Sequence, residues 1–135
     1  MTIVEMLVRN ARMYPDDSAL IELKPGKGFR KEITWKEFDE RANRMANALR
    51  ERGIGKGDRV MHMMMNSINW LEAYFGILKT GAWACPLNFR FPAKDIKYCA
   101  DIAEPSIMIL GEEFVERVQE ARPQLTTIKD YIFLG

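Results

Sequence analysis

The sequence has 135 residues, of which 47% are hydrophobic and 29% charged, a balance typical of one soluble globular domain. Its 20 basic and 19 acidic residues leave a net charge of +1, which gives no general attraction to nucleic acid or to an anionic membrane. We therefore expect no nucleic-acid partner.

The N-terminus lacks the basic start and unbroken apolar core of a secretory signal, and no apolar run is long enough to span a membrane. Cys85 and Cys99 have no metal or redox spacing and are expected to be buried free thiols. These features predict a cytoplasmic protein.

Residues 1–33 are expected to form a helix followed by a β-hairpin. Apolar residues one helical turn apart predict a helix that ends before Pro15. Residues 18–23 are predicted to form a strand. Residues 29–33 are expected to return as its partner after the turn Pro25-Gly26-Lys27-Gly28.

From residue 34 onward, strands and helices are expected to alternate. Thr34 and Glu37 have the spacing of a capping box at a helix start. Strands are predicted over 59–65, 82–87, 106–110 and from 131, and helices over 68–80, 92–102 and 112–121. The inward stripe of helix 68–80 is expected to consist of Leu71, Phe75 and Leu78.

This alternation predicts an α/β fold with a mostly parallel sheet and helices on both faces. We expect one domain over residues 1–135. The helix and hairpin would occupy 1–33, and the alternating sheet 34–135.

Two apparent binding motifs are better interpreted as structural. Gly53, Gly55 and Gly57 follow a helix and precede a strand, the reverse of a dinucleotide-binding fingerprint, so we interpret them as a helix stop and turn. His62 lies among four methionines, but successive strand residues point to opposite faces. We interpret this segment as a buried strand rather than a metal site.

The segment Asn88-Phe89-Arg90-Phe91-Pro92 follows the carboxyl end of a predicted parallel strand, where open α/β sheets bind ligands. Arg90 offers a planar fork of donors suited to phosphate, and Lys94 and Lys97 follow it. By spacing alone, a solvated surface arginine is the alternative.

Several short motifs occur in one fixed order along the chain. They are Thr34-Trp35-Lys36-Glu37-Phe38, Asn43-Arg44-Met45-Ala46-Asn47-Ala48-Leu49, Gly57-Asp58-Arg59-Val60, Asn66-Ser67, Leu78-Lys79-Thr80-Gly81-Ala82 and Pro86-Leu87-Asn88. Together they resemble the N-terminal region of the adenylate-forming enzymes, the acyl-CoA synthetases and related AMP-dependent synthetases and ligases. The Pro86-Leu87-Asn88 loop with Arg90 is more similar to the acyl-CoA ligase branch than to the peptide-synthetase branch.

The resemblance implies that a carboxylic acid reacts with ATP to give an acyl-adenylate and pyrophosphate, and that the thiol of coenzyme A then displaces AMP. ATP, coenzyme A and Mg²⁺ are implied for the full-length enzyme only, together with a mobile C-terminal domain. The family's phosphate loop, ribose-binding aspartate and C-terminal lysine are expected downstream of residue 135. We therefore assign no catalytic residue and no metal ligand in this chain, and expect it to be inactive alone.

In some ligases of this family, the arginine after the Pro-Leu-Asn motif contacts a phosphate of coenzyme A. Arg90 occupies that place, and the resemblance implies that Arg90 and Lys94 bind this phosphate.

Two alternatives remain open at this level. One is a non-catalytic binding module or split subunit, and the other is an adenylating enzyme that loads a carrier protein. The identity of the acid cannot be deduced, because later residues form most of its pocket.

A sheet of this family would continue past residue 135, so some apolar side chains are expected to lose their cover and the chain to self-associate. The candidates are Val60, Met63, Met65, Trp83, Ile107, Ile109, Ile132 and Phe133.

Overall fold

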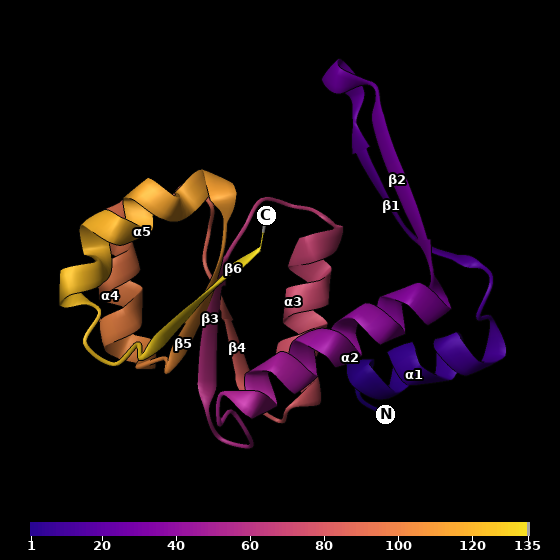
Figure 1. Ribbon diagram of the computed structural model, residues 1–135, viewed down its shortest axis with the longest axis horizontal. Coiled ribbons are helices and arrows are strands. Elements are labelled where there is room, and N and C mark those ends of the chain that lie inside the picture. Colours follow the sequence, from indigo (N-terminus) through magenta and orange to yellow (C-terminus); the bar gives the residue numbers. More distant parts are fainter. Residues whose placement is uncertain (135) are drawn as a thin grey trace.

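The structure is a computed structural model that describes residues 1–134. A four-stranded sheet is flanked by helices, and a long β-hairpin projects from the N-terminal side of the molecule (Figure 1). The α/β class predicted from the sequence is confirmed.

The N-terminal part contains the predicted helix and hairpin. Helix α1 (Ile3–Met13) begins with a capping box, in which the Thr2 hydroxyl accepts from the Glu5 N–H and the Glu5 carboxylate accepts from the Thr2 N–H. Strands β1 (Ser18–Lys24) and β2 (Phe29–Thr34) pair antiparallel around the 3₁₀ turn η1 (Pro25–Lys27).

Helix α2 (Trp35–Glu51) begins at Thr34, whose hydroxyl accepts from the Glu37 N–H at 3.1 Å. The Glu37 carboxylate accepts from the Thr34 hydroxyl at 3.3 Å, not from its backbone. Only half of the predicted capping box is therefore formed.

The sheet has the strand order β4-β3-β5-β6, and all its neighbouring strands are parallel. Its strands are β3 (Arg59–Met63), β4 (Trp83–Pro86), β5 (Ile107–Gly111) and β6 (Asp130–Leu134). The chain leaves central strand β3 for edge strand β4 and then crosses back to β5. The topological switch point therefore lies between β3 and β5.

Helices cover both faces of the sheet, as predicted (Figure 1). One face carries α2 and α3 (Ile68–Lys79), and the other α4 (Ala93–Ala103) and α5 (Val115–Ala121). Short 3₁₀ turns, η2 (Glu112–Phe114) and η3 (Arg122–Gln124), flank α5.

Alternate residues of strand β5 point into the two hydrophobic cores on opposite faces of the sheet. Ile107 and Ile109 pack with α2 and α3, whereas Met108 and Leu110 pack with α4 and α5.

Helix α3 differs from the expectation in its buried face. The side chains it buries most are those of Ile68, Ala73 and Ile77, with Gly76, while Leu71, Phe75 and Leu78 are half-buried. The predicted stripe is wrong because α3 has two packing partners. Ala73 and Ile77 meet the sheet, whereas Leu71 and Phe75 pack on the N-terminal cluster around Phe38.

Of the apolar side chains predicted to lose their cover, only some are exposed. Met65 is 41% exposed, Trp83 68% and Phe133 53%. Four other candidates are at most 2% exposed because helices pack on both sides of the central strands, and these are Val60, Met63, Ile107 and Ile109. Ile132 is half-buried.

Candidate functional site

The carboxyl ends of β3, β5 and β6 border a cleft of about 730 Å³. Residues of the β1–β2 hairpin also line this cleft. The loop after β3, Met64 to Ser67, forms one wall together with Gly111 and Glu112 at the end of β5. The cleft thus lies at the switch point, where open α/β sheets form binding crevices.

The hairpin wall of the cleft is held in place by a helix terminus. The Glu22 carboxylate accepts a hydrogen bond from the Ile68 N–H at the start of α3, with an N–O distance of 2.6 Å. A carboxylate at a helix N-terminus is favoured by the helix dipole. Lys24, Lys27 and Lys31 of the hairpin line the same cleft, as do Glu112 and Glu113.

Arg90 lies in the loop between β4 and α4, as predicted. Its side chain is exposed, and its guanidinium stacks over the Phe89 ring at 5.2 Å from the centroid. The Arg90 N–H donates to the Asn88 side-chain oxygen at 2.8 Å, and the Phe91 N–H donates to the Asn88 carbonyl at 3.0 Å. The loop is therefore an ordered turn built on Asn88.

Lys94 is exposed on the first turn of α4. Arg90 and Lys94 lie at the carboxyl end of the sheet but do not line the 730 Å³ cleft. Phe89 and Phe91 instead pack toward the core beneath α4 and α5. The structure thus places these cations at the predicted end of the sheet but outside the cleft.

Arg117 of α5 makes a contact with the Arg90 loop that the sequence alone does not predict. One terminal nitrogen of its guanidinium, Nη1, donates to the Phe89 carbonyl at 2.6 Å and to the Phe91 carbonyl at 3.2 Å. The guanidinium also lies over the Phe114 ring at 5.3 Å. No motif signals this contact, because it joins residues 28 apart in the sequence.

His62 is fully buried within β3, so Met61 to Met63 form the expected buried strand. Met64 and Met65 follow the end of the strand, and Met65 is 41% exposed. Its ring lies 4.8 Å from the Trp70 ring and 6.1 Å from the Tyr74 ring, measured between centroids. Neither ring nitrogen has a hydrogen-bond partner in the described part of the chain. Burial lowers the pKa of His62 from 6.5 to about 4, so the imidazole is neutral near pH 7.

The glycines after α2 form a turn, as expected. Gly53 and Gly57 both have positive φ, 86° and 89°, which favours glycine over residues with a Cβ. The Gly55 N–H donates to the Asp58 carboxylate at 2.8 Å.

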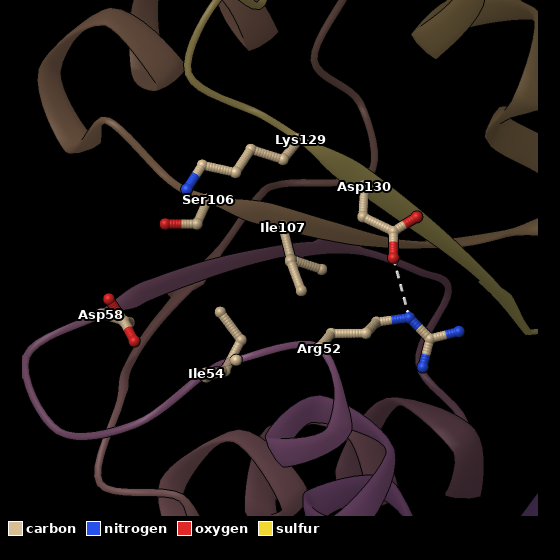
Figure 2. A pocket seen from close by; sticks show the side chains of 8 residues that line it. Arg52, Ile54, Asp58, Ser106, Ile107, Lys129 and Asp130 are labelled. Atoms are coloured by element: carbon tan, nitrogen blue, oxygen red, sulfur yellow. Dashed lines mark hydrogen bonds and ion pairs between the residues drawn. The ribbon is translucent and has the colours of Figure 1, made fainter.

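This turn borders a smaller cleft of about 220 Å³ at the amino ends of β5 and β6 (Figure 2). Arg52 donates to Asp130 there at 2.8 Å, and the Lys129 and Asp58 side chains lie on opposite sides of the opening. This end of a parallel sheet is the one opposite to the usual ligand sites. The larger cleft and the Arg90 loop are therefore the better candidates.

Two general features concern the described residues alone. Within residues 1–134, no helix is both long and apolar enough to cross a bilayer. The same residues contain no group of three His, Cys, Asp or Glu side chains placed to hold a metal ion.

Comparison with known proteins finds relatives that match almost the whole chain. The chain is 38% identical over 93 residues to a 3-hydroxybenzoate–CoA/4-hydroxybenzoate–CoA ligase of Thauera aromatica, and this match covers 69% of the chain and 18% of that protein. It is 31% identical over 130 residues to the long-chain-fatty-acid–CoA ligase FadD13 of Mycobacterium tuberculosis, covering 94% of this chain and 25% of that one.

Among solved structures, the anthranilate CoA ligase AuaEII in complex with anthranoyl-AMP superposes with a TM-score of 0.89 at 25% identity. That match covers 100% of this chain and 25% of the ligase. The chain therefore spans a quarter or less of the length of each of these three proteins.

The sequence model that describes AMP-binding enzymes matches residues 7–134. This match includes the whole parallel sheet, the Arg90 loop and the larger cleft at the switch point. The chain belongs to the family of AMP-binding enzymes.

Proposed function

We propose that this chain is the N-terminal part of an ATP-dependent acyl-CoA synthetase. In the complete enzyme, a carboxylate oxygen attacks the α-phosphorus of ATP and pyrophosphate leaves. The thiolate sulfur of coenzyme A then attacks the acyl carbon, forming the thioester and releasing AMP. Support comes from the family match over residues 7–134 and from relatives that are named CoA ligases.

We further propose that Arg90 and Lys94 bind a phosphate of coenzyme A. Arg90 is exposed at the carboxyl end of β4, and the Asn88 turn orders its backbone. Among residues 1–134, neither cation forms an ion pair with a carboxylate. A planar guanidinium without an acidic partner is well suited to bind phosphate with two parallel hydrogen bonds.

The other groups of the reaction are assigned to no residue here. The described residues contain no cluster that fits Mg²⁺, and we assign neither it nor ATP to a side chain of this chain. We expect the chain alone to show no carboxylate-dependent exchange between ATP and pyrophosphate, because phosphoryl transfer needs charged groups aimed at the phosphates. The free cysteines Cys85 and Cys99 support a cytoplasmic location in this proposal.

The experiment separates the two half-reactions in the full-length enzyme with Arg90→Ala. We expect the KM for coenzyme A to rise roughly 10- to 150-fold, the equivalent of a charged hydrogen bond of about 1.5–3 kcal/mol. Carboxylate-dependent ATP–pyrophosphate exchange should stay near the wild-type rate, because the contact involves only the thiol donor. Arg90→Lys should restore part of the loss.

Lys97→Ala is the matched control, because Lys97 is also a cation on α4 but already pairs with Asp101 at 2.5 Å. It should leave both half-reactions unchanged. Equal loss in both half-reactions for Arg90→Ala would reject the assignment of Arg90. If the full-length enzyme adenylates an acid but transfers the acyl group only to a carrier protein, the proposal of an acyl-CoA synthetase is wrong.

A further inference from the structure

We propose that Arg117 is a positioning residue that holds Arg90 in the orientation required for phosphate binding. The inference rests on the function proposed above for Arg90. The two carbonyl groups that accept hydrogen bonds from Arg117 belong to Phe89 and Phe91, the residues on either side of Arg90. One guanidinium nitrogen of Arg117 thus bonds the backbone on both sides of Arg90, the residue proposed to bind the phosphate.

Besides this tether, the Phe89 and Phe91 side chains pack on the core, and the other hydrogen bonds made by the N–H groups of residues 87, 90 and 91 do not reach α5. The Arg90 and Phe91 N–H groups both donate to Asn88, which lies in the loop itself. The Leu87 N–H donates to the His62 carbonyl at 2.8 Å and so fixes only the start of the loop on β3. Among these polar contacts, the one from Arg117 links the far side of the loop to another element.

The Arg117 side chain is itself held firmly enough to act as a tether. It is half-buried, and its guanidinium packs over the Phe114 ring at the start of α5. Phe114 is 3% exposed and belongs to the core shared by α4 and α5. The orientation of the loop is thereby coupled to the rigid part of the domain.

The acceptors of Arg117 are neutral carbonyls. Within residues 1–134, Arg117 forms no ion pair. No ion-paired carboxylate therefore competes with the Phe89 and Phe91 carbonyls for its guanidinium.

The test is a double-mutant cycle in the full-length enzyme with Arg117→Ala, Arg90→Ala and the combined variant. Arg117→Ala should raise the KM for coenzyme A about tenfold, as expected for one misplaced charged contact, and leave the ATP–pyrophosphate exchange rate unchanged. The combined variant should be no worse than Arg90→Ala, because Arg117 acts through Arg90. Arg117→Lys should recover part of the effect, since an ammonium can still donate to one carbonyl.

Arg122→Ala is the matched control. Arg122 follows the last residue of α5 and stacks over the Tyr131 ring at 5.0 Å, a contact of the same kind that involves no residue of the Arg90 loop. A second readout needs no activity. In the 135-residue chain, the Arg90 and Phe91 amide hydrogens should exchange faster in Arg117→Ala than in wild type or Arg122→Ala.

The outcomes separate this inference from the function on which it rests. If Arg90→Ala raises the KM for coenzyme A but Arg117→Ala changes neither that KM nor the amide exchange, the positioning role is wrong and the phosphate assignment stands. If Arg90→Ala itself has no effect, the phosphate assignment fails. The positioning role is also wrong if the increases in the KM for coenzyme A caused by Arg90→Ala and Arg117→Ala multiply in the combined variant. It is equally wrong if Arg117→Ala weakens both half-reactions by the same factor.

Discussion

Gly76 of α3 lies so close to Met45 of α2 that a methyl group at position 76 would stand 2.5 Å from the Met45 Cβ atom and 3.2 Å from the Ala42 carbonyl oxygen. The two helices therefore approach each other at a point where only glycine fits. Met45 Cβ is attached directly to the backbone, so the clash cannot be relieved by a rotamer change alone.

We expect Gly76→Ala to destabilise the protein by about 1–3 kcal/mol, because overpacking outweighs the gain in helix propensity. Urea unfolding would measure the free energy. Gly55→Ala is the control, since a Cβ at position 55 meets nothing within 4 Å. A Gly76→Ala protein as stable as the Gly55→Ala control would show that α2 and α3 separate at little cost.

The α2–α3 contact also contains a largely buried ion pair. Lys79 Nζ lies 2.6 Å from the Asp39 carboxylate, and their side chains are 8% and 20% exposed. Asp39→Ala leaves the ammonium buried and unpaired, which should cost about 3 kcal/mol. Asp39→Ala combined with Lys79→Met should be more stable than Asp39→Ala alone.

The exposed pair Lys97–Asp101, with side chains 41% and 52% exposed, provides the comparison. Asp101→Ala should cost only about 0.5 kcal/mol or less in the same unfolding assay. Similar losses for Asp39→Ala and Asp101→Ala would mean that burial does not strengthen the Lys79–Asp39 pair.

His62 should make the stability sensitive to acid. Its folded-state pKa of about 4 lies below the ordinary value of 6.5, so the unfolded chain binds the proton more tightly. Stability from this group is present above about pH 6.5 and is lost as the pH falls toward about 4. Between about pH 7 and about pH 5, the loss should be about 2 kcal/mol.

His62→Leu should remove this part of the pH dependence. The free energy of unfolding would be measured for both proteins at the two pH values, and the other titratable groups cancel in the difference. Removing two unpaired buried nitrogens should also leave the variant at least as stable as wild type at about pH 5. Parallel pH profiles for the two proteins would contradict the neutral, buried state of His62.

Self-association is expected from the two edges of the sheet. Trp83 on edge strand β4 is 68% exposed, and Phe133 on edge strand β6 is 53% exposed. Edge strands with unpaired backbone groups and exposed apolar side chains favour pairing between chains. Sedimentation equilibrium of the 135-residue chain should therefore show an average mass that rises with concentration.

Phe133→Lys should weaken this association, because a charge on an edge strand opposes pairing. Tyr98→Lys is a suitable control, since Tyr98 is 67% exposed on α4 and belongs to neither edge strand. A strictly monomeric profile for the wild-type chain would rule out association through the edges.

Most of the secondary structure could be predicted from local pattern, because its causes are local. Ser67 caps α3 by accepting from the Trp70 N–H, three residues away. Pro15 follows α1, and Gly57 supplies a positive φ just before β3. The candidate position of Arg90 was equally predictable, since it depends only on a short loop that follows a parallel strand.

Local sequence patterns alone therefore predict the order of helices and strands, the α/β class and the position of Arg90 after β4. The strand order β4-β3-β5-β6, the two packing faces of α3 and the contact of Arg117 with the Arg90 loop arise only when the chain folds. The two groups of features differ in the range of the interactions behind them. Caps, turns and hydrophobic periods act between close neighbours, whereas these contacts join segments far apart in the chain and exist only once the elements have packed.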